Sequence, residues 1–235
     1  MTDLPSPYRL VFFDNDGTLN SRRSFVEYFN QHFGTWDSRA RSLLEHHLRD
    51  RTPYDEFVRE CVRLWTGVPK ERFLERLRTI EIRPGVPELI RALKSAGIKT
   101  AVLSSGLTLW RDMWLERENI AFDHYHANEL IFDSDNLCTG EIEMRVTDNI
   151  PGMDKGSFVE RISALEGVPI EQRVFVGDGW GDVSGFRKCA FGVAVDPNLE
   201  EVRLGARYVL GPDEFSKLHE ILLPSRAQYP SRPTI

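Results

Sequence analysis

The sequence has little of what marks several classes of protein. Three of its 235 residues are cysteines, and they are too far apart for a disulfide framework or a zinc cluster. No apolar run approaches the ~20 residues that cross a bilayer, and the first ten residues lack the apolar core of a secretory signal. The chain has 30 basic and 36 acidic residues, for a net charge of −6, so nucleic-acid binding is not expected. We therefore expect a cytoplasmic protein that binds neither membranes nor nucleic acid.

What remains is the composition of an ordinary globular protein. Hydrophobic residues make up 41% of the chain and charged residues 28%. That mixture excludes a disordered, collagenous or coiled-coil chain, and the length is sufficient for a sizeable hydrophobic core.

The hydrophobic pattern divides the chain into two kinds of segment. Residues 21–84 have apolar side chains at helical spacing, which predicts about four helices and no strand. Residues 85–223 alternate between stretches with strand-like patterns and stretches with helical spacing. Strands are predicted at 9–13, 98–103, 124–131, 137–147, 173–177, 191–195 and 207–210, and helices at 86–96, 107–118, 155–166, 182–189, 198–204 and just before 223.

Strands that alternate with helices form parallel sheets covered on both faces. We therefore predict an α/β fold, with a Rossmann-like parallel sheet formed by residues 1–20 and 85–223. An all-helical cap domain at 21–84 interrupts this core after its first strand, and residues 224–235, rich in proline, form a flexible tail.

Polar side chains follow three of the predicted strands, at the edge where open α/β sheets bind ligands. The segments are DNDGT at 14–18, SSG at 104–106 and GDGWGD at 177–182. Four carboxylates that meet at one edge repel one another, and a bound cation allows them to stay ionised together. Oxygen ligands of this kind suit Mg²⁺ with a substrate phosphate. The candidate metal ligands are Asp14, Asp16, Asp178 and Asp182.

The first of these segments suits phosphoryl transfer. Asp14 and Asp16 are two residues apart at a strand end, so they can face the same side. One carboxylate can attack phosphorus, while the other protonates the leaving oxygen and then deprotonates water. Gly17 permits a tight turn whose backbone N–H groups can bind an anion.

Further candidates for phosphate binding lie at the other strand ends. The hydroxyl groups of Thr18 and Ser104 can donate hydrogen bonds to phosphate oxygens, next to Ser105 and Gly106 in the second segment. Lys155, which opens a predicted helix, supplies a positive charge to the transferred group.

Taken in order, these motifs resemble those of the haloacid dehalogenase superfamily of phosphohydrolases. The matching stretches are DNDGT at 14–18, AVLSSG at 101–106, Lys155 within MDKGS, and VGDGWGD at 176–182. The helical insertion and the stretch HANELIFDSDNLCTGEI at 126–142 are similar to the phosphoserine-phosphatase-like branch, which has a C1-type cap.

The resemblance implies a role for each motif residue. Asp14 would be the nucleophile that forms an aspartyl-phosphate, and Asp16 the general acid and base. Mg²⁺ would be held by Asp14, the backbone carbonyl of Asp16 and Asp178, with Asp182 in support. Ser104 and Lys155 would bind the phosphate of a small phosphate ester.

One departure from that branch concerns the substrate. Phosphoserine phosphatases carry a glutamate soon after the first motif, which contacts the substrate amine, whereas this chain has Arg22 and Arg23 there. The reversed charge argues against phosphoserine and for a second anionic or oxygen-rich group. Trp180, flanked by glycines, either lines the substrate entrance or packs under the cap.

Three functions remain open at this point. The first is a Mg²⁺-dependent phosphomonoesterase, with phosphoserine phosphatase proper as a variant of it. The second is a phosphotransferase or mutase on the same scaffold, and the third is a binding module without catalysis.

Overall fold

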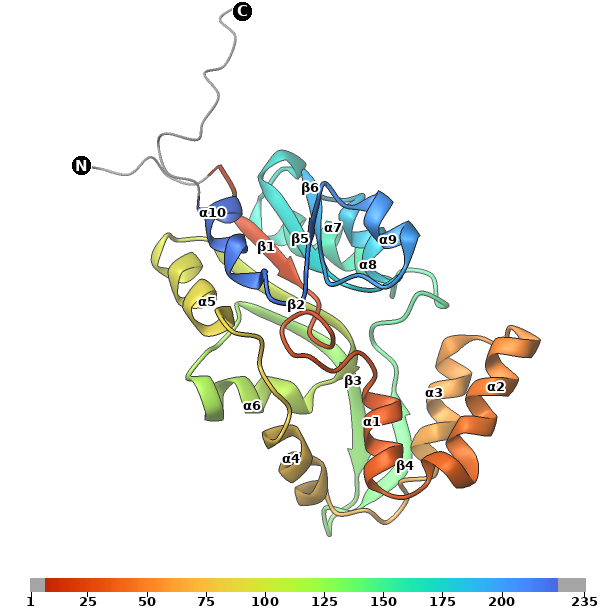
Figure 1. The fold of residues 1–235 in the computed structure, drawn as a ribbon. Helices are drawn as coiled ribbons and strands as arrows, with labels where there is room; N and C mark the ends of the chain where they lie inside the picture. Colours follow the sequence, from red (N-terminus) through yellow and green to blue (C-terminus); the bar gives the residue numbers. More distant parts are fainter. Residues whose placement is uncertain (1–6, 224–235) are drawn as a thin grey trace, which may run out of the picture.

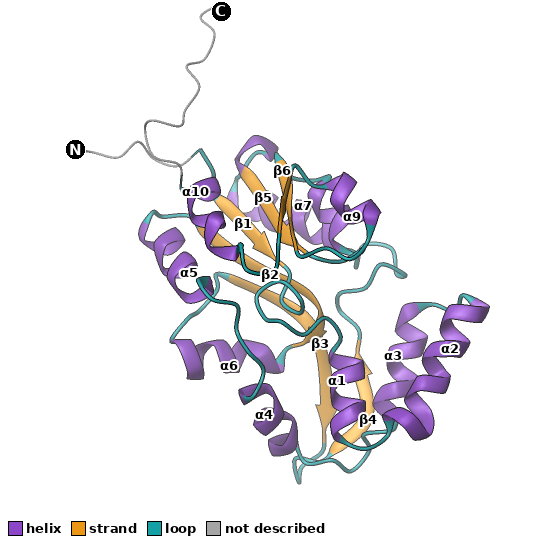
Figure 2. Cartoon of the chain, in the orientation of Figure 1, coloured by secondary structure: helices purple, strands orange, loops and turns teal. Residues whose placement is uncertain are grey.

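The computed structural model describes residues 7–223, so the predicted tail at 224–235 lies outside the described residues. A seven-stranded sheet in the order β4-β3-β2-β1-β5-β6-β7 forms the centre (Figures 1 and 2). Neighbouring strands run parallel except β3 and β4, which are antiparallel. The strands are β1 (Leu10–Phe13), β2 (Lys99–Leu107), β3 (His124–Phe132), β4 (Cys138–Glu143), β5 (Arg173–Gly177), β6 (Phe191–Val195) and β7 (Tyr208–Leu210).

Helices cover both faces of this sheet because side chains of the central strands alternate between them. In β1, Leu10 and Phe12 belong to one hydrophobic core, whereas Val11 and Phe13 belong to the other. The helices are α5 (Val86–Ser95), α6 (Leu109–Glu118), α7 (Lys155–Glu166), α8 (Asp182–Phe186), α9 (Glu200–Gly205) and α10 (Leu218–Leu222), with 3₁₀ turns at Ile170–Gln172 and Phe215–Lys217. Residues of α7, α8 and α9 pack in the core of Leu10 and Phe12, and those of α5, α6 and α10 in the other.

Residues 21–84, which we call the helical insertion, contain helices and no named strand among the residues described there (Figure 2). Ser24 caps the first helix by accepting a hydrogen bond from the Glu27 amide at 3.2 Å. A π-helical turn, Trp36–Ala40, runs directly into the second. The helices are α1 (Phe25–His32), α2 (Arg41–Asp50), α3 (Tyr54–Arg63) and α4 (Lys70–Arg78).

The insertion has an aromatic core of its own. The Phe29 ring lies 5.6 Å from that of Trp65 and 5.0 Å from that of Phe73, and all three side chains are fully buried. Burial of aromatic rings of this size is the main favourable contribution to packing these short helices.

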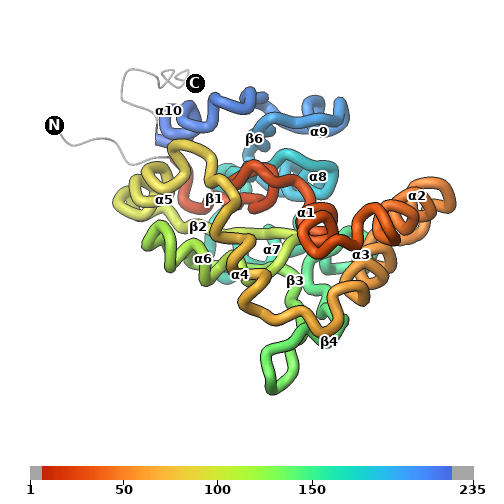
Figure 3. The backbone as a smooth tube through the Cα atoms, turned by 60° about the horizontal axis from the view of Figure 1, so that its bottom comes forward, coloured from red at the N-terminus to blue at the C-terminus, as the bar shows by residue number. Residues whose placement is uncertain are grey.

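Backbone hydrogen bonds attach the insertion to the core at two places. The two linkers that join it to the core run side by side, since the Ser21 amide donates to Glu81 at 3.2 Å and the Arg83 amide to Leu19 at 3.0 Å. Between α3 and α4, away from the linkers, the Gly67 amide donates to the Cys138 carbonyl of β4 at 2.8 Å. The insertion therefore lies across the β3–β4 end of the sheet, with α2 and α3 projecting to one side (Figures 1 and 3).

The predicted α/β fold is confirmed, with one addition: the sheet is mixed rather than wholly parallel, because β4 returns as a hairpin partner of β3. Among residues 7–223, no helix combines the length and apolar character needed to span a bilayer.

Candidate active site

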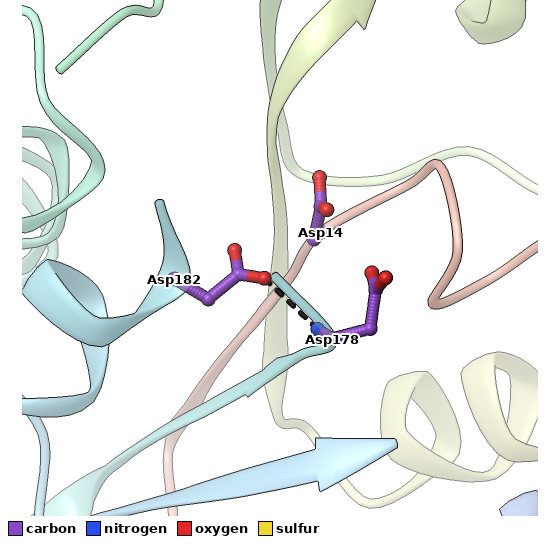
Figure 4. A group of neighbouring side chains, drawn as sticks. All are labelled: Asp14, Asp178 and Asp182. Atoms are coloured by element: carbon purple, nitrogen blue, oxygen red, sulfur yellow. Dashed lines mark hydrogen bonds between the residues drawn. The ribbon is translucent and has the colours of Figure 1, made fainter. Parts of the chain in front are cut away.

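Three carboxylates meet at the carboxyl ends of the two central strands. Asp14 directly follows β1, Asp178 directly follows β5, and Asp182 is the first residue of α8. Each offers a carboxylate oxygen within 4.8 Å of the other two, and none is more than 7% exposed. Figure 4 shows the three side chains as neighbours, two from strand ends and one from the start of a helix.

A buried lysine lies against this cluster. The Nζ of Lys155, at the start of α7, is 2.6 Å from Asp182 Oδ1 and 3.0 Å from Asp14 Oδ1. Asp182 Oδ2 accepts hydrogen bonds from the backbone amides of Asp178 at 2.9 Å and Gly179 at 2.8 Å (Figure 4). Asp182 therefore fixes both the lysine and the loop that carries Asp178.

The cluster holds more negative charge than its partners neutralise. Burial raises the pKa of Asp14 well above its ordinary value against the lowering effect of Lys155, and burial together with Asp182 raises the pKa of Asp178 to about 7. Arg23 is 3.8 Å from Asp178. Three buried carboxylates around one lysine suit a divalent cation with oxygen ligands, so the residues present fit Mg²⁺.

Asp16 lies beside the cluster, and only one of its two carboxylate oxygens accepts hydrogen bonds from residues that the structure describes. Its Oδ1 accepts hydrogen bonds from the amide groups of Asn15 and Asn20, each at 2.9 Å. Its Oδ2 is buried without a hydrogen-bond partner among the described residues. Burial raises the pKa of Asp16 to about 6, so this carboxyl group can both donate and accept a proton near neutral pH.

Glycine is needed at two positions around these carboxylates. A Cβ at Gly106 would lie 2.1 Å from Asp16 Oδ2, and a Cβ at Gly17 would lie 2.2 Å from Asp178 Oδ2. Gly17 also has φ of +88°, in the left-handed region that glycine tolerates best.

The predicted phosphate-binding residues occupy different depths. Ser105 lines the site cavity, whereas Ser104 is only 1% exposed and its hydroxyl oxygen accepts a hydrogen bond from the Gly106 amide at 2.9 Å. Thr18 donates its hydroxyl hydrogen to Asp178 Oδ1 at 2.9 Å.

A fully buried amide side chain connects the Ser105 loop to the segment after β4. Asn128 Nδ2 donates to the Ser105 carbonyl at 2.8 Å, and its Oδ1 accepts from the backbone amides of Arg145 at 2.7 Å and Val146 at 2.8 Å. The next residue, Thr147, is 3% exposed and lines the cavity, and its hydroxyl has no partner among the described residues.

A cavity of about 430 Å³ unites these groups. Eight of the residues singled out in the sequence line it: Asp14, Asp16, Arg23, Ser105, Lys155, Asp178, Trp180 and Asp182. The Trp180 side chain is 61% exposed, which fits a position at the entrance rather than under the insertion. Arg22 instead stacks on the Tyr28 ring of α1, with its guanidinium 5.4 Å from the ring centre.

Six further lining residues were missed by sequence reasoning. His47, Thr52 and Tyr54 come from the α2–α3 corner, and Thr147, Asp148 and Asn149 follow β4. Asn149 Nδ2 donates to Asp55 of the insertion at 3.4 Å, so the segment after β4 contacts the start of α3 directly. Burial, followed by the charge of Asp16, raises the pKa of Tyr54, which keeps its hydroxyl protonated. The one sequence signal was Pro53, which marks the start of α3 but not the direction in which Tyr54 points.

Carboxylates and a lysine at the strand ends of an α/β sheet, under a helical insertion, define a two-part α/β enzyme. The model of the family described as haloacid dehalogenase-like hydrolase matches residues 11–187. The chain belongs to this family, and the predicted family, fold and hydrolase class are confirmed.

Relatives and solved structures are similar to the chain over most of its length. It is 34% identical over 195 residues to a phosphoserine phosphatase of Archaeoglobus fulgidus, covering 83% of this chain but 54% of that protein. It is 28% identical to a phosphoserine phosphatase of Methanocaldococcus jannaschii, with coverages of 82% and 89%. The structure of an apo phosphoserine phosphatase superposes with a TM-score of 0.74 at 26% identity, covering 92% of this chain and 98% of the other.

Proposed function

We propose that the chain is a Mg²⁺-dependent phosphomonoesterase that hydrolyses a small phosphorylated metabolite through an aspartyl-phosphate on Asp14. The observation that carries this proposal is the buried cluster of Asp14, Asp178 and Asp182 around Lys155, with Asp16 beside it. Relatives named phosphoserine phosphatase support it.

Asp14 is the proposed nucleophile because it lies at the end of β1, where its carboxylate belongs to the acidic cluster and contacts Lys155. A carboxylate oxygen of Asp14 attacks phosphorus, the ester P–O bond breaks, and the alcohol leaves with a proton from Asp16. Asp16 then takes a proton from water, whose oxygen attacks phosphorus and releases Asp14 and phosphate. Mg²⁺ held by Asp14, the Asp16 carbonyl and Asp178, with Asp182 in support, would neutralise charge on the transferred group.

We assign phosphate binding to Lys155 and to the two loops that flank Asp14. Lys155 offers a charge 3.0 Å from the nucleophile. Gly106 lies against the Asp16 carboxylate, and Ser104 and Ser105 directly precede it in the same loop. The tight turn at Gly17, with its positive φ, can present backbone amides to a phosphate. Thr18, whose hydroxyl bonds to Asp178, acts by fixing that ligand.

The helical insertion at 21–84 is the proposed cap, and residues 1–20 with 85–223 the catalytic core. His47, Thr52 and Tyr54 line the cavity from the insertion, opposite the carboxylates of the core. In that position the insertion can exclude water and select the leaving group. We propose that Arg23 and Trp180, which line the same cavity, contribute to that selection, with Arg22 outside it.

Phosphoserine is the second candidate substrate because relatives carry that name. Against it stands the positive charge of Arg23 in the cavity, which favours an anionic or oxygen-rich leaving group. Hydrolysis of phosphoserine, sugar phosphates and enol phosphates in parallel, with added alcohols as competing acceptors, separates these substrates and also detects phosphotransfer. The three cysteines are free and buried, which suits the cytoplasm that we propose as the location.

The decisive experiment measures phosphate release from para-nitrophenyl phosphate with Mg²⁺. The wild-type chain should turn over this substrate, and Asp14→Asn should abolish turnover. Asp213→Asn, which removes the same charge from an exposed loop, should retain it. Equal turnover by Asp14→Asn and the wild-type chain would refute the nucleophile assignment.

A further inference from the structure

Asp196 lies where the core meets both linkers of the helical insertion. It directly follows β6, its φ is +47°, and its backbone amide donates to the Leu210 carbonyl at 2.7 Å. Each linker sends one arginine toward this residue: Arg23 from the first and Arg83 from the second.

The two arginines connect Asp196 to the catalytic loops. Arg23 donates from one guanidinium nitrogen to Asp196 Oδ2 at 2.7 Å and to the Asp196 carbonyl, while its other terminal nitrogen lies 3.8 Å from Asp178 Oδ2. Arg83 is 7% exposed, donates to the Gly17 carbonyl at 2.8 Å, and lies 3.5 Å from Asp196 Oδ2. One carboxylate therefore holds both linkers and, through them, reaches both the Gly17 turn and Asp178.

We propose that Asp196 is a positioning residue that clamps the two linkers and holds Arg23 away from Asp178. The proposal rests on the proposed function only because it takes Asp178 as a ligand of the divalent cation. Arg23 is then shared between a structural carboxylate and a metal ligand, and Asp196 sets how closely it approaches Asp178.

The charge and the reach of Arg23 allow it to move closer to Asp178. Arginine has a long, flexible side chain, and Arg23 already lies close to Asp178. Without the Asp196 carboxylate, the guanidinium can close the remaining ~1 Å and pair with Asp178, where its charge opposes a divalent cation. At the dielectric constants that describe pairs near a protein surface, this approach should weaken cation binding about three- to tenfold.

The test uses the full chain and Asp196→Asn. Asparagine tolerates a positive φ, so the backbone after β6 is preserved. Mn²⁺ binding, measured by electron paramagnetic resonance, should weaken about three- to tenfold. The double variant Asp196→Asn with Arg23→Gln should restore the affinity, and the gain should exceed the one that Arg23→Gln gives in the wild-type chain. A purely structural defect would leave the effect of Arg23→Gln equal in both backgrounds. Amide hydrogen exchange should become faster in peptides covering 18–24 and 80–86, and remain unchanged in α4.

Asp213→Asn is the matched control, because it removes one carboxylate charge from an exposed loop of the same core. Wild-type affinity and wild-type linker exchange in Asp196→Asn would overturn the proposal. Weakened binding that Arg23→Gln fails to restore would overturn the part assigned to Arg23. If the wild-type chain binds no Mn²⁺, the proposed function fails, whereas the exchange measurement still decides whether Asp196 clamps the linkers.

Discussion

Replacing Gly17 with alanine tests whether the turn after Asp14 is built around the Asp178 carboxylate. The new Cβ would lie 2.2 Å from Asp178 Oδ2, whereas ordinary contact begins at 3.4 Å. The carboxylate, or the turn that faces it, must therefore move by about 1 Å, a displacement that can lower catalysis about 100-fold. A non-glycine residue in the left-handed region costs a further ~1–2 kcal/mol of stability. At this chain length, that cost lowers Tm by about 2–8 °C.

The control separates the strain of the backbone from the collision. Gly34 also has a positive φ, +72°, but a Cβ there meets nothing within 4 Å. Gly34→Ala should therefore lose a similar amount of stability and keep full phosphatase activity and Mn²⁺ affinity. Phosphate release, Mn²⁺ binding and thermal unfolding are measured for both variants. If Gly17→Ala keeps more than half of the wild-type kcat/KM, the turn after Asp14 does not depend on close packing against the Asp178 carboxylate.

Three further predictions concern other parts of the molecule. Tyr54→Phe removes one hydrogen-bond donor from the cavity, so it should lower kcat/KM about three- to tenfold for the best substrate among the phosphate esters compared above, with Tm unchanged. Kinetics equal to those of the wild-type chain would exclude a contact between Tyr54 and the substrate. Asn128→Ala should destabilise the fold by about 3 kcal/mol in urea unfolding, because two backbone amides lose their buried acceptor. Burial lowers the pKa of His126, so protonation opposes folding and stability falls as the pH drops below about 6.5. His126→Gln should reduce that loss of Tm, and an unchanged pH profile would contradict it.

The core of the fold could be predicted from the sequence because its elements have strong periodic patterns with clear ends. The strands 173–177 and 191–195 and the helix 155–166 lie where predicted. Strand β2 extends to Leu107, beyond the predicted 103, because the Ser-Ser-Gly loop continues as extended backbone. The antiparallel pairing of β4 was not predicted, since the alternation of side chains along a strand does not specify which neighbouring strand it pairs with.

The candidate site could be predicted only where its residues lie on that framework. Asp14, Asp178 and Lys155 lie at the ends of predicted elements, so topology alone brings them to one edge. Tyr54 and Asp196 could not be predicted, because their positions depend on how the insertion packs across the sheet and on a loop with positive φ. Contacts of that kind join residues far apart in the chain, and local patterns do not encode them.

The acidic cluster also shows where the sequence departs from the rules that stabilise a fold. Acidic side chains on the helices of the insertion are mostly exposed to solvent. Asp14, Asp178 and Asp182, in contrast, are buried together with one lysine. Burial of like charges opposes folding, and the raised pKa values of Asp14 and Asp178 express that opposition. The surrounding structure maintains it through the amides that bind Asp182 and the hydroxyl that binds Asp178. Because the fold keeps these carboxylates close together although their charges repel, we infer that the cluster is organised to bind a charged ligand. A cation bound together with a phosphate would balance the charges of this cluster.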